Sequence, residues 1–156
     1  LEEKSVAYSY DDTGRFSPDE LLFAIALYDP DGNQIDNPDF IEEVKRYFST
    51  AKVADFSFVI AFGEESEDIY YDLLNTYPEY RYYAILRVGV TDFKQYRDEI
   101  YARTEGRVTI VSSSDEREIA VQDSYMVGSG HDSESASYDS LLREARIIAG
   151  RLLEEL

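Results

Sequence analysis

The segment around the single histidine of this chain carries the residue types best suited to hold a ligand. It reads Gly128-Ser129-Gly130-His131-Asp132 and precedes a predicted long C-terminal helix. Glycines let backbone N–H groups approach an anion, and a helix N-terminus behind them adds positive potential. A plain flexible connection is the simpler interpretation of this loop, and the functional prediction is that these five residues bind a small anionic ligand. Because sequence neighbours seldom form a catalytic triad, no catalytic role is assigned to His131.

A second polar segment resembles the calcium loop of EF-hand proteins. Carboxylate and amide oxygens recur at Asp29, Asp31, Asn33 and Asp39, which is the donor type that a cage of about 6–8 oxygen ligands requires. Gln34 stands where the EF-hand turn needs a glycine, and no second loop follows. We interpret the segment as an acidic turn, with calcium as the alternative, and we expect no other cofactor.

Residues 118–131 also resemble the phospholipase D-like superfamily, in which a histidine-lysine-aspartate motif precedes a Gly-Ser pair. Asp123 and Ser129 occupy the matching positions, whereas Glu116 and Glu118 stand where the catalytic His and Lys would be. The resemblance implies a domain without phosphodiesterase chemistry, similar to the ligand-sensing halves of some archaeal transcription regulators.

Six tyrosines fall within residues 70–83. Tyrosine combines a large apolar body with a polar tip, which suits both packing with the hydroxyl at the rim and contact with another protein. We expect packing first and a protein interface, including a homo-oligomer contact, second. The six are Tyr70, Tyr71, Tyr77, Tyr80, Tyr82 and Tyr83.

The elements that must position these residues follow from the hydrophobic pattern. It predicts a single α/β domain over residues 1–156, with a mostly parallel or mixed sheet of about five strands under four to five helices. Strands that alternate with helices are joined by right-handed crossovers, so the sheet is expected to be largely parallel, with one hairpin between residues 112 and 118. The predicted strands are residues 5–10, 53–62, 81–90, 107–112 and 118–127, and the predicted helices are residues 38–48, 64–77, 91–103 and 137–156.

Residues 21–28 are apolar on every side, so periodicity does not separate a buried helix from a buried strand. The preceding Ser17-Pro18-Asp19-Glu20 is a helix-start signal, with a capping serine, a proline in the first turn and a glutamate three residues after the cap. We therefore favour a helix here, with a buried strand as the alternative.

The charge of the chain limits its class. It has 33 Asp and Glu against 15 Lys and Arg, a net charge of −18, yet 44% of its residues are hydrophobic, which is typical of a folded domain. Few lysines beside many arginines resemble the usage of salt-in haloarchaea, so we expect salt adaptation, with a basic partner as the alternative. Binding to nucleic-acid phosphates needs a basic patch, and thiol chemistry needs cysteine; the sequence has neither.

No apolar run approaches the roughly 20 residues of a membrane span, and no signal-like start is visible, so we expect a cytoplasmic protein. The chain begins with Leu1 rather than Met, which is expected of a processed form or a fragment. The functional hypothesis is a non-catalytic ligand-binding or sensory module. The alternatives are a protein-interaction subunit with a tyrosine-rich surface, and a degenerate phospholipase D-like or EF-hand domain.

Overall fold

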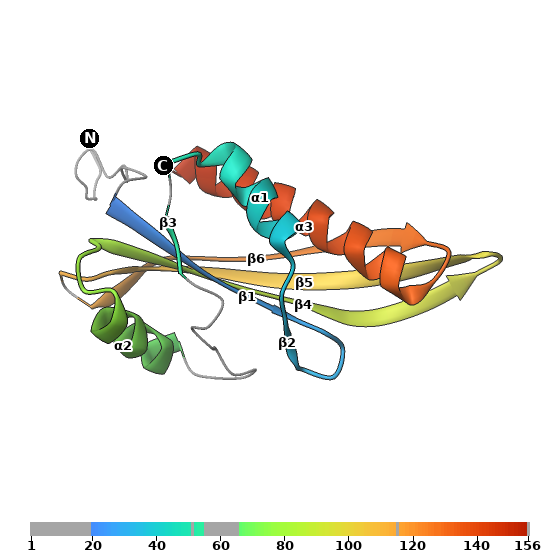
Figure 1. The fold of residues 1–156 in the computed structure, drawn as a ribbon, viewed down its shortest axis with the longest axis horizontal. Helices are drawn as coiled ribbons and strands as arrows, with labels where there is room; N and C mark the ends of the chain where they lie inside the picture. Colours follow the sequence, from blue (N-terminus) through green and yellow to red (C-terminus); the bar gives the residue numbers. More distant parts are fainter. Residues whose placement is uncertain (1–19, 51, 55–65, 115, 156) are drawn as a thin grey trace.

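The computed structural model describes residues 20–50, 52–54, 66–114 and 116–155. In these residues a six-stranded mixed sheet is flanked by three helices, the last of them long (Figure 1). The mixed α/β class and the long C-terminal helix are therefore confirmed, whereas the described residues hold fewer helices than the four to five predicted. The strand predicted over residues 5–10, the helix start at residue 17 and most of the strand over residues 53–62 lie outside the described residues.

The sheet has the order β2-β1-β4-β5-β6, and β3 pairs with β1 outside this path. Only the pairings of β1 with β3 and with β4 are parallel, and the β4–β5–β6 meander is antiparallel, including the hairpin predicted between residues 112 and 118. The sheet is thus mixed rather than largely parallel. The strands are β1 (Leu21–Tyr28), β2 (Gln34–Ile35), β3 (Lys52–Val53), β4 (Tyr82–Tyr96), β5 (Glu99–Ser112) and β6 (Arg117–Gly130), and the helices are α1 (Pro38–Tyr47), α2 (Ser66–Thr76) and α3 (Ser133–Glu155).

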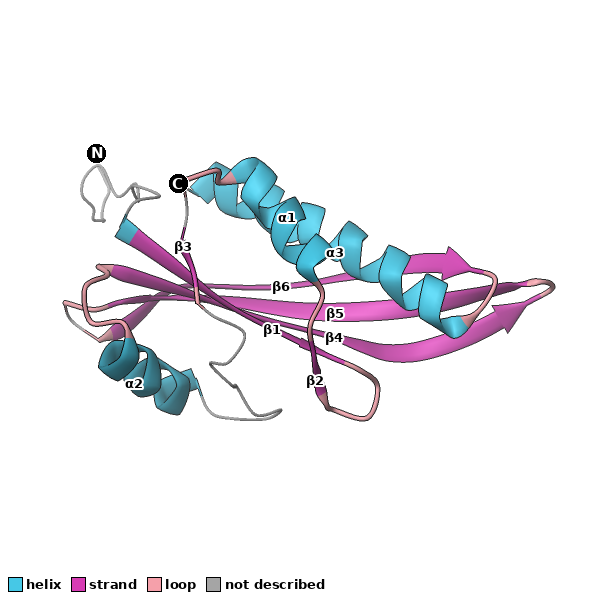
Figure 2. Ribbon diagram, viewed as in Figure 1, coloured by secondary structure: helices cyan, strands magenta, loops and turns pink. Residues whose placement is uncertain are grey.

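The helices lie on opposite faces of the sheet. Figure 2 shows α1 and α3 together on one face, with α3 running along the strands, and α2 on the other face near one end. Glu43 on α1 is buried and accepts a hydrogen bond from Arg146 on α3 at 3.2 Å, which joins the two helices. Two cores result, a larger one under α1 and α3 and a smaller one under α2.

The apolar run at residues 21–28 forms strand β1, so the helix favoured from the sequence is wrong. Leu21, Phe23 and Leu27 pack into the larger core, whereas Leu22 and Tyr28 pack into the smaller one. A strand buried on both faces needs apolar residues at every position, which removes the alternation that identifies half-buried strands. The capping signal at residues 17–20 therefore does not decide this segment.

The helix predicted over residues 91–103 is also wrong, because this segment is the hairpin that joins β4 to β5. Tyr96 pairs with Glu99, so the connection is only Arg97 and Asp98, and Arg97 has a left-handed φ of 58°. Such tight turns usually carry glycine or asparagine, and their absence hides the turn from sequence patterns. Phe93 and Ile100 pack against the larger core from two strands rather than from one helix.

Candidate interaction surface

The β4–β5–β6 meander extends beyond α2, and its face on the α2 side is left without a described helix over that length (Figure 1). Side chains alternate between the two faces of a strand, so the strand register shows which residues share this face. We call this surface the open sheet face. Its charged and large apolar members are Arg87, Asp92, Lys94, Tyr96, Glu99, Tyr101, Arg103, Glu105, Arg107, Val121, Asp123, Tyr125 and Val127.

Large apolar side chains gather on this face. Nine of them are exposed in the described residues, and five belong to the open sheet face: Tyr96 (61%), Tyr101 (37%), Val121 (47%), Tyr125 (59%) and Val127 (46%). Single exposed apolar residues are ordinary on protein surfaces, but a group on one flat face is typical of binding sites.

Strand β6 has the reverse of the usual polarity. Its residues that face solvent include Val121, Tyr125 and Val127, whereas Ser124 and Gly128 face α3. A strand with one buried face normally turns its apolar set toward the core. In β6 three large apolar side chains face outward and, of those described, only Met126, paired with the buried Thr104, lies on the α3 side, so burial in this chain's own core does not explain the outward group.

Polar contacts between α3 and the meander explain how the reversed strand is tolerated. The Ser124 hydroxyl donates to Glu144 Oε1 at 3.0 Å, and the Thr104 and Ser140 hydroxyls share a hydrogen bond. The Ser140 hydroxyl also lies 3.3 Å from the Met126 carbonyl oxygen. Buried polar groups that are hydrogen-bonded cost little, so a polar seam under α3 replaces the apolar contacts expected there.

Charged side chains on the open sheet face pair with one another across the strands. Arg107 donates to Asp123 with both Nε and a terminal nitrogen, at 2.7 and 3.0 Å. These hydrogen bonds raise the pKa of Arg107 and lower the pKa of Asp123. Arg103 donates to Glu105 at 3.1 Å, and its guanidinium lies 4.1 Å from the centre of the Tyr125 ring. Both ion pairs are solvent-exposed, so they order the surface more than they stabilise the fold.

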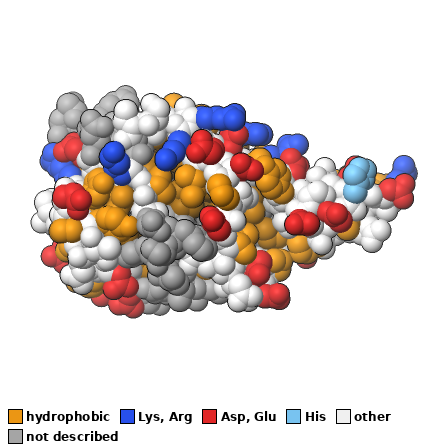
Figure 3. Space-filling model, viewed as in Figure 1, with side chains coloured by type: hydrophobic (Ala, Val, Ile, Leu, Met, Phe, Trp, Pro, Cys, Tyr) orange, Lys and Arg blue, Asp and Glu red, His pale blue; other side chains and the backbone are white. Residues whose placement is uncertain are grey.

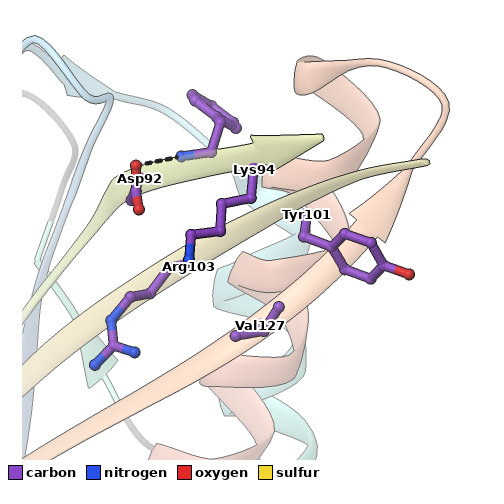
Figure 4. A pocket seen from close by; sticks show the side chains of 6 residues that line it. Asp92, Lys94, Tyr101, Arg103 and Val127 are labelled. Atoms are coloured by element: carbon purple, nitrogen blue, oxygen red, sulfur yellow. Dashed lines mark hydrogen bonds between the residues drawn. The ribbon is translucent and has the colours of Figure 1, made fainter. Parts of the chain in front are cut away.

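A shallow groove of about 210 Å³ crosses this face beside the β-bulge between Val90 and Asp92. Figure 4 shows the labelled side chains of Lys94, Tyr101, Arg103 and Val127, which come from all three strands. Phe93 donates its backbone N–H to Asp92 Oδ1 at 2.9 Å at one end of the groove. The groove is lined by both apolar and charged side chains, so it suits a protruding side chain of a protein partner.

The open sheet face is close to electrically balanced, although the chain carries −18: its members include four acidic and four basic side chains, and the exposed Glu118 adds one acid at the end near α2. The acids are Asp92, Glu99, Glu105 and Asp123, and the bases are Arg87, Lys94, Arg103 and Arg107. Figure 3 shows acidic side chains dispersed over another side of the molecule in small groups. The net negative charge is therefore carried by the rest of the chain.

The outer edge of β6 is partly occupied by side chains of α3. Asp139 Oδ2 accepts from the Ser129 N–H at 3.0 Å, and Arg151 donates to the Asp123 carbonyl at 3.3 Å. Exposed edge strands recruit other strands unless such groups are covered. These contacts favour the face of the meander over its edge as the place where another molecule docks.

The glycines of the predicted anion site lie at the end of β6, not in the loop expected from the sequence, and they pack against the backbone of α3. A side chain at Gly128 would place its Cβ 2.2 Å from the backbone nitrogen of Ser140, and one at Gly130 would lie 2.7 Å from that of Ala136. The two glycines thus let helix and strand approach closely. That role is sufficient to explain both, and anion binding by residues 128–132 stays a prediction.

The last two residues of that segment lie directly before helix α3, which begins at Ser133. Asp132 caps it: its Oδ1 accepts from the Ser135 backbone N–H at 2.8 Å, and the pKa of Asp132 is lowered mainly by this hydrogen bond. His131 is exposed beside the cap. A catalytic role for His131 would require its ring to be fixed in a pocket by a carboxylate, and its exposed position differs from that arrangement.

The predicted calcium ligands lie around the β1–β2 turn and the start of α1. Asp29 Oδ1 accepts the backbone N–H groups of Asp31 and Asn33 at 3.0 and 2.9 Å, which makes it a turn-stabilising carboxylate. Asp39 accepts a hydrogen bond from the Tyr138 hydroxyl of α3. Within the described residues no group of three or more suitable side chains is placed to hold a metal ion.

The tyrosines of residues 70–83 do not form one surface. Tyr70 and Tyr83 are buried in the core under α2, with ring centres 6.0 Å apart, and Tyr80 packs against Tyr83. Tyr71 is 45% exposed, and the neighbouring Glu116 and Glu67 raise its pKa. Most of this set serves packing.

The exposed apolar residues that gather together are on the open sheet face, which the sequence interpretation missed. The alternation of Val121, Tyr125 and Val127 is visible in the sequence. Alternation alone does not say which side of a strand is buried, and an apolar set is expected on the buried side. The signal was therefore present, but its ordinary interpretation points to the wrong face.

Asp123 and Ser129, the positions of the phospholipase D-like resemblance, both lie on β6. Asp123 pairs with Arg107, and the Ser129 N–H with Asp139. No protein-family profile matches the chain, and no curated protein matches it at a significant level.

Several solved structures are similar to this chain over most of its length, at low TM-scores. PelC from Paraburkholderia phytofirmans, described as a dodecamer, has 10% identity and a TM-score of 0.49 over 90% of this chain and 91% of that chain. A lipoprotein from Neisseria meningitidis has 10% identity and a TM-score of 0.44 over 86% and 98%. A minor lipoprotein from Acinetobacter baumannii has 11% identity and a TM-score of 0.42 over 85% and 90%. At such low scores and identities the likeness assigns no function to this chain.

The cytoplasmic location expected from the sequence is contradicted by these neighbours, since two of the three are lipoproteins, and we withdraw it. The likeness does not supply another location. Among the described helices, none has both the length and the apolar character needed to cross a bilayer.

Proposed function

We propose that this chain is a non-catalytic protein-interaction module that docks another folded protein on the open sheet face. The observation that carries the proposal is the reversed polarity of β6, in which Val121, Tyr125 and Val127 face solvent. Tyrosine and arginine are enriched at protein interfaces, and Tyr125 stacked under Arg103 supplies both. The proposed partner surface is mixed in polarity and close to neutral, because this face is balanced in charge.

A photoreactive amino acid placed on this face tests the proposal. Substituted for Tyr125 in cells of the organism that encodes the chain, it should form a covalent adduct with a protein. The matched control is Tyr71, which is also an exposed tyrosine but lies on α2. Val127→Asp, beside the probe on the same strand, should abolish the Tyr125 adduct because it introduces a charge into the face.

Two outcomes contradict the proposal. If Tyr125 and Tyr71 give the same products, or if the Tyr125 adduct persists in Val127→Asp, the open sheet face is not a specific docking surface.

Ligand binding and a sensory role remain predictions tied to residues 128–132, and the described contacts of these residues do not add support to them.

A further inference from the structure

We infer that the occupant of the open sheet face is the same face of a second copy of this chain, in a dimer that salt strengthens. The inference rests on the proposed function, because it names the partner of that surface. The charge of the face, its area and the ion pairs already present on it support a second copy.

The charge distribution indicates which kind of protein can dock on this face. A basic protein would be drawn to the acidic remainder of the chain, whose net charge is −18 overall, and not to the nearly balanced face. A strongly acidic partner without a neutral face would be repelled by the chain as a whole. A second copy avoids both problems, because it is acidic elsewhere and nearly balanced at the contact. Two-fold symmetry then lets one surface serve both partners.

The charged side chains on the face are also already paired with one another, which lowers the cost of such a contact. Arg107 and Asp123 already pair at 2.7 Å, and Arg103 is held by Glu105 and by the Tyr125 ring. Charges that are paired before association lose less hydration free energy when they are covered than isolated charges do. Tyr125 and Val127 then supply apolar area between the ion pairs.

The size of the face determines how strong the dimer is. Three strands spaced about 4.8 Å apart and some nine residues long give a footprint of about 400 Å². This is roughly half of the ~800 Å² that each partner contributes to a standard interface, so the dimer belongs to the weak class. We expect a dissociation constant in the range of roughly micromolar to millimolar.

Ionic strength provides the specific signature. Two chains of −18 repel each other at long range, and this repulsion is screened as the Debye length falls from ~10 Å at 0.1 M salt to ~3 Å at 1 M. The contact itself holds nearly equal numbers of acids and bases, so it gains no net attraction that salt would remove. Raising KCl from about 0.1 M to 1 M should therefore tighten the dimer by at least roughly tenfold.

Sedimentation equilibrium of the purified chain over that concentration and salt range tests the inference. Lys94→Glu makes the face acidic and should weaken the dimer by roughly tenfold or more, because each copy gains like charge at the contact. Lys45→Glu on α1 makes the same charge change away from the face, so in 1 M KCl, where long-range repulsion is screened, it should leave the dimer as in the parent. Val127→Asp should also abolish the dimer, whereas Leu153→Asp, which alters a similarly exposed apolar residue of α3, should not. Melting curves of all four variants show whether each is folded.

Three results would overturn the inference: a chain that stays monomeric at millimolar concentration in molar salt, a dimer that salt weakens, or a dimer that survives both Lys94→Glu and Val127→Asp. The proposed function can hold even where this inference fails. If the purified chain is monomeric while the photoreactive Tyr125 position still gives a Val127-dependent adduct with a different protein, the face is a docking surface for another partner. If the adduct is also absent, both ideas are wrong.

Discussion

Replacement of Gly128 by alanine gives the most direct test of how α3 is seated on β6. The added Cβ would lie 2.2 Å from the backbone nitrogen and 2.6 Å from the Cα of Ser140, whereas heavy atoms pack best at about 3.5–4.0 Å. Helix and strand would have to separate locally by about 1.3 Å. Because both clashing atoms belong to the helix backbone, no side-chain rotation relieves the contact.

The size of the effect follows from what α3 holds in place. Leu141, Ala145 and Ile148 of this helix are buried in the larger core, and displacing it loosens their packing. Overpacking of this kind costs about 1–3 kcal/mol, and a clash with rigid backbone belongs at the upper end of that range. We expect Gly128→Ala to lower the free energy of unfolding by about 3 kcal/mol. For a chain of this size, that loss corresponds to a melting temperature lower by roughly 6–12 °C.

The measurement is urea unfolding followed by circular dichroism, with Gly150→Ala as the matched control. Gly150 lies in α3, and a Cβ added there would meet no atom within 4 Å, so alanine should raise stability by about 0.5–1 kcal/mol through its better helix propensity. If Gly128→Ala stays within about 0.5 kcal/mol of the parent, the close approach of α3 to β6 is wrong. The glycine would then be free for the anion-binding role predicted from the sequence.

Three further predictions concern pH, salt and calcium. Burial raises the pKa of Glu144, so the stability that its protonated form contributes is complete below the unfolded-state pKa of about 4.3 and is lost as pH rises through the folded-state pKa. Glu144→Gln should therefore be more stable than the parent at neutral pH and lose that advantage in acid. Equal pH profiles of the two proteins in thermal unfolding would refute this. If the acidity reflects salt adaptation, the melting temperature should rise from roughly 0.05 M to 2 M KCl, and an unchanged value would count against it. Calcium should shift the melting temperature of neither the parent nor Asp31→Ala, because Asp29 already accepts two backbone N–H groups; a shift in the parent that the variant lacks would restore the calcium site.

Glu144 also shows what sequence reasoning overlooked among buried groups. Its side chain is fully buried, and although Ser124 donates to one oxygen, Oε2 has no hydrogen-bond partner among the described residues. The sequence places this residue in an ordinary helix pattern beside apolar neighbours. Its burial arises only because α3 lies across β5 and β6, where Gly106 leaves room beneath it. No local pattern reports such a contact between distant segments.

Local sequence determined several elements because their causes are local. Asn37 accepts the N–H groups of Asp39 and Phe40 with Pro38 in the first turn, so α1 begins where its capping residues require. The periodic apolar residues before the C-terminus likewise predict α3, and acidic residues at its start and at the start of α2 suit a helix N-terminus. The acidic composition and the apolar fraction are properties of the sequence alone.

Tertiary structure decided the other features of the fold, because they depend on which neighbouring elements cover each segment. Residues 21–28 form a strand because β4 pairs along their whole length and both faces are buried, and a capping signal upstream does not outweigh that pairing. Phe93 and Ile100 fit a helical spacing and a hairpin equally well until the larger core fixes their positions. The outward set of β6 is the clearest case. Alternation shows that Val121, Tyr125 and Val127 share a face, but only the placement of α3 on the opposite side, with its polar seam and close approach at Gly128, leaves that apolar face to solvent.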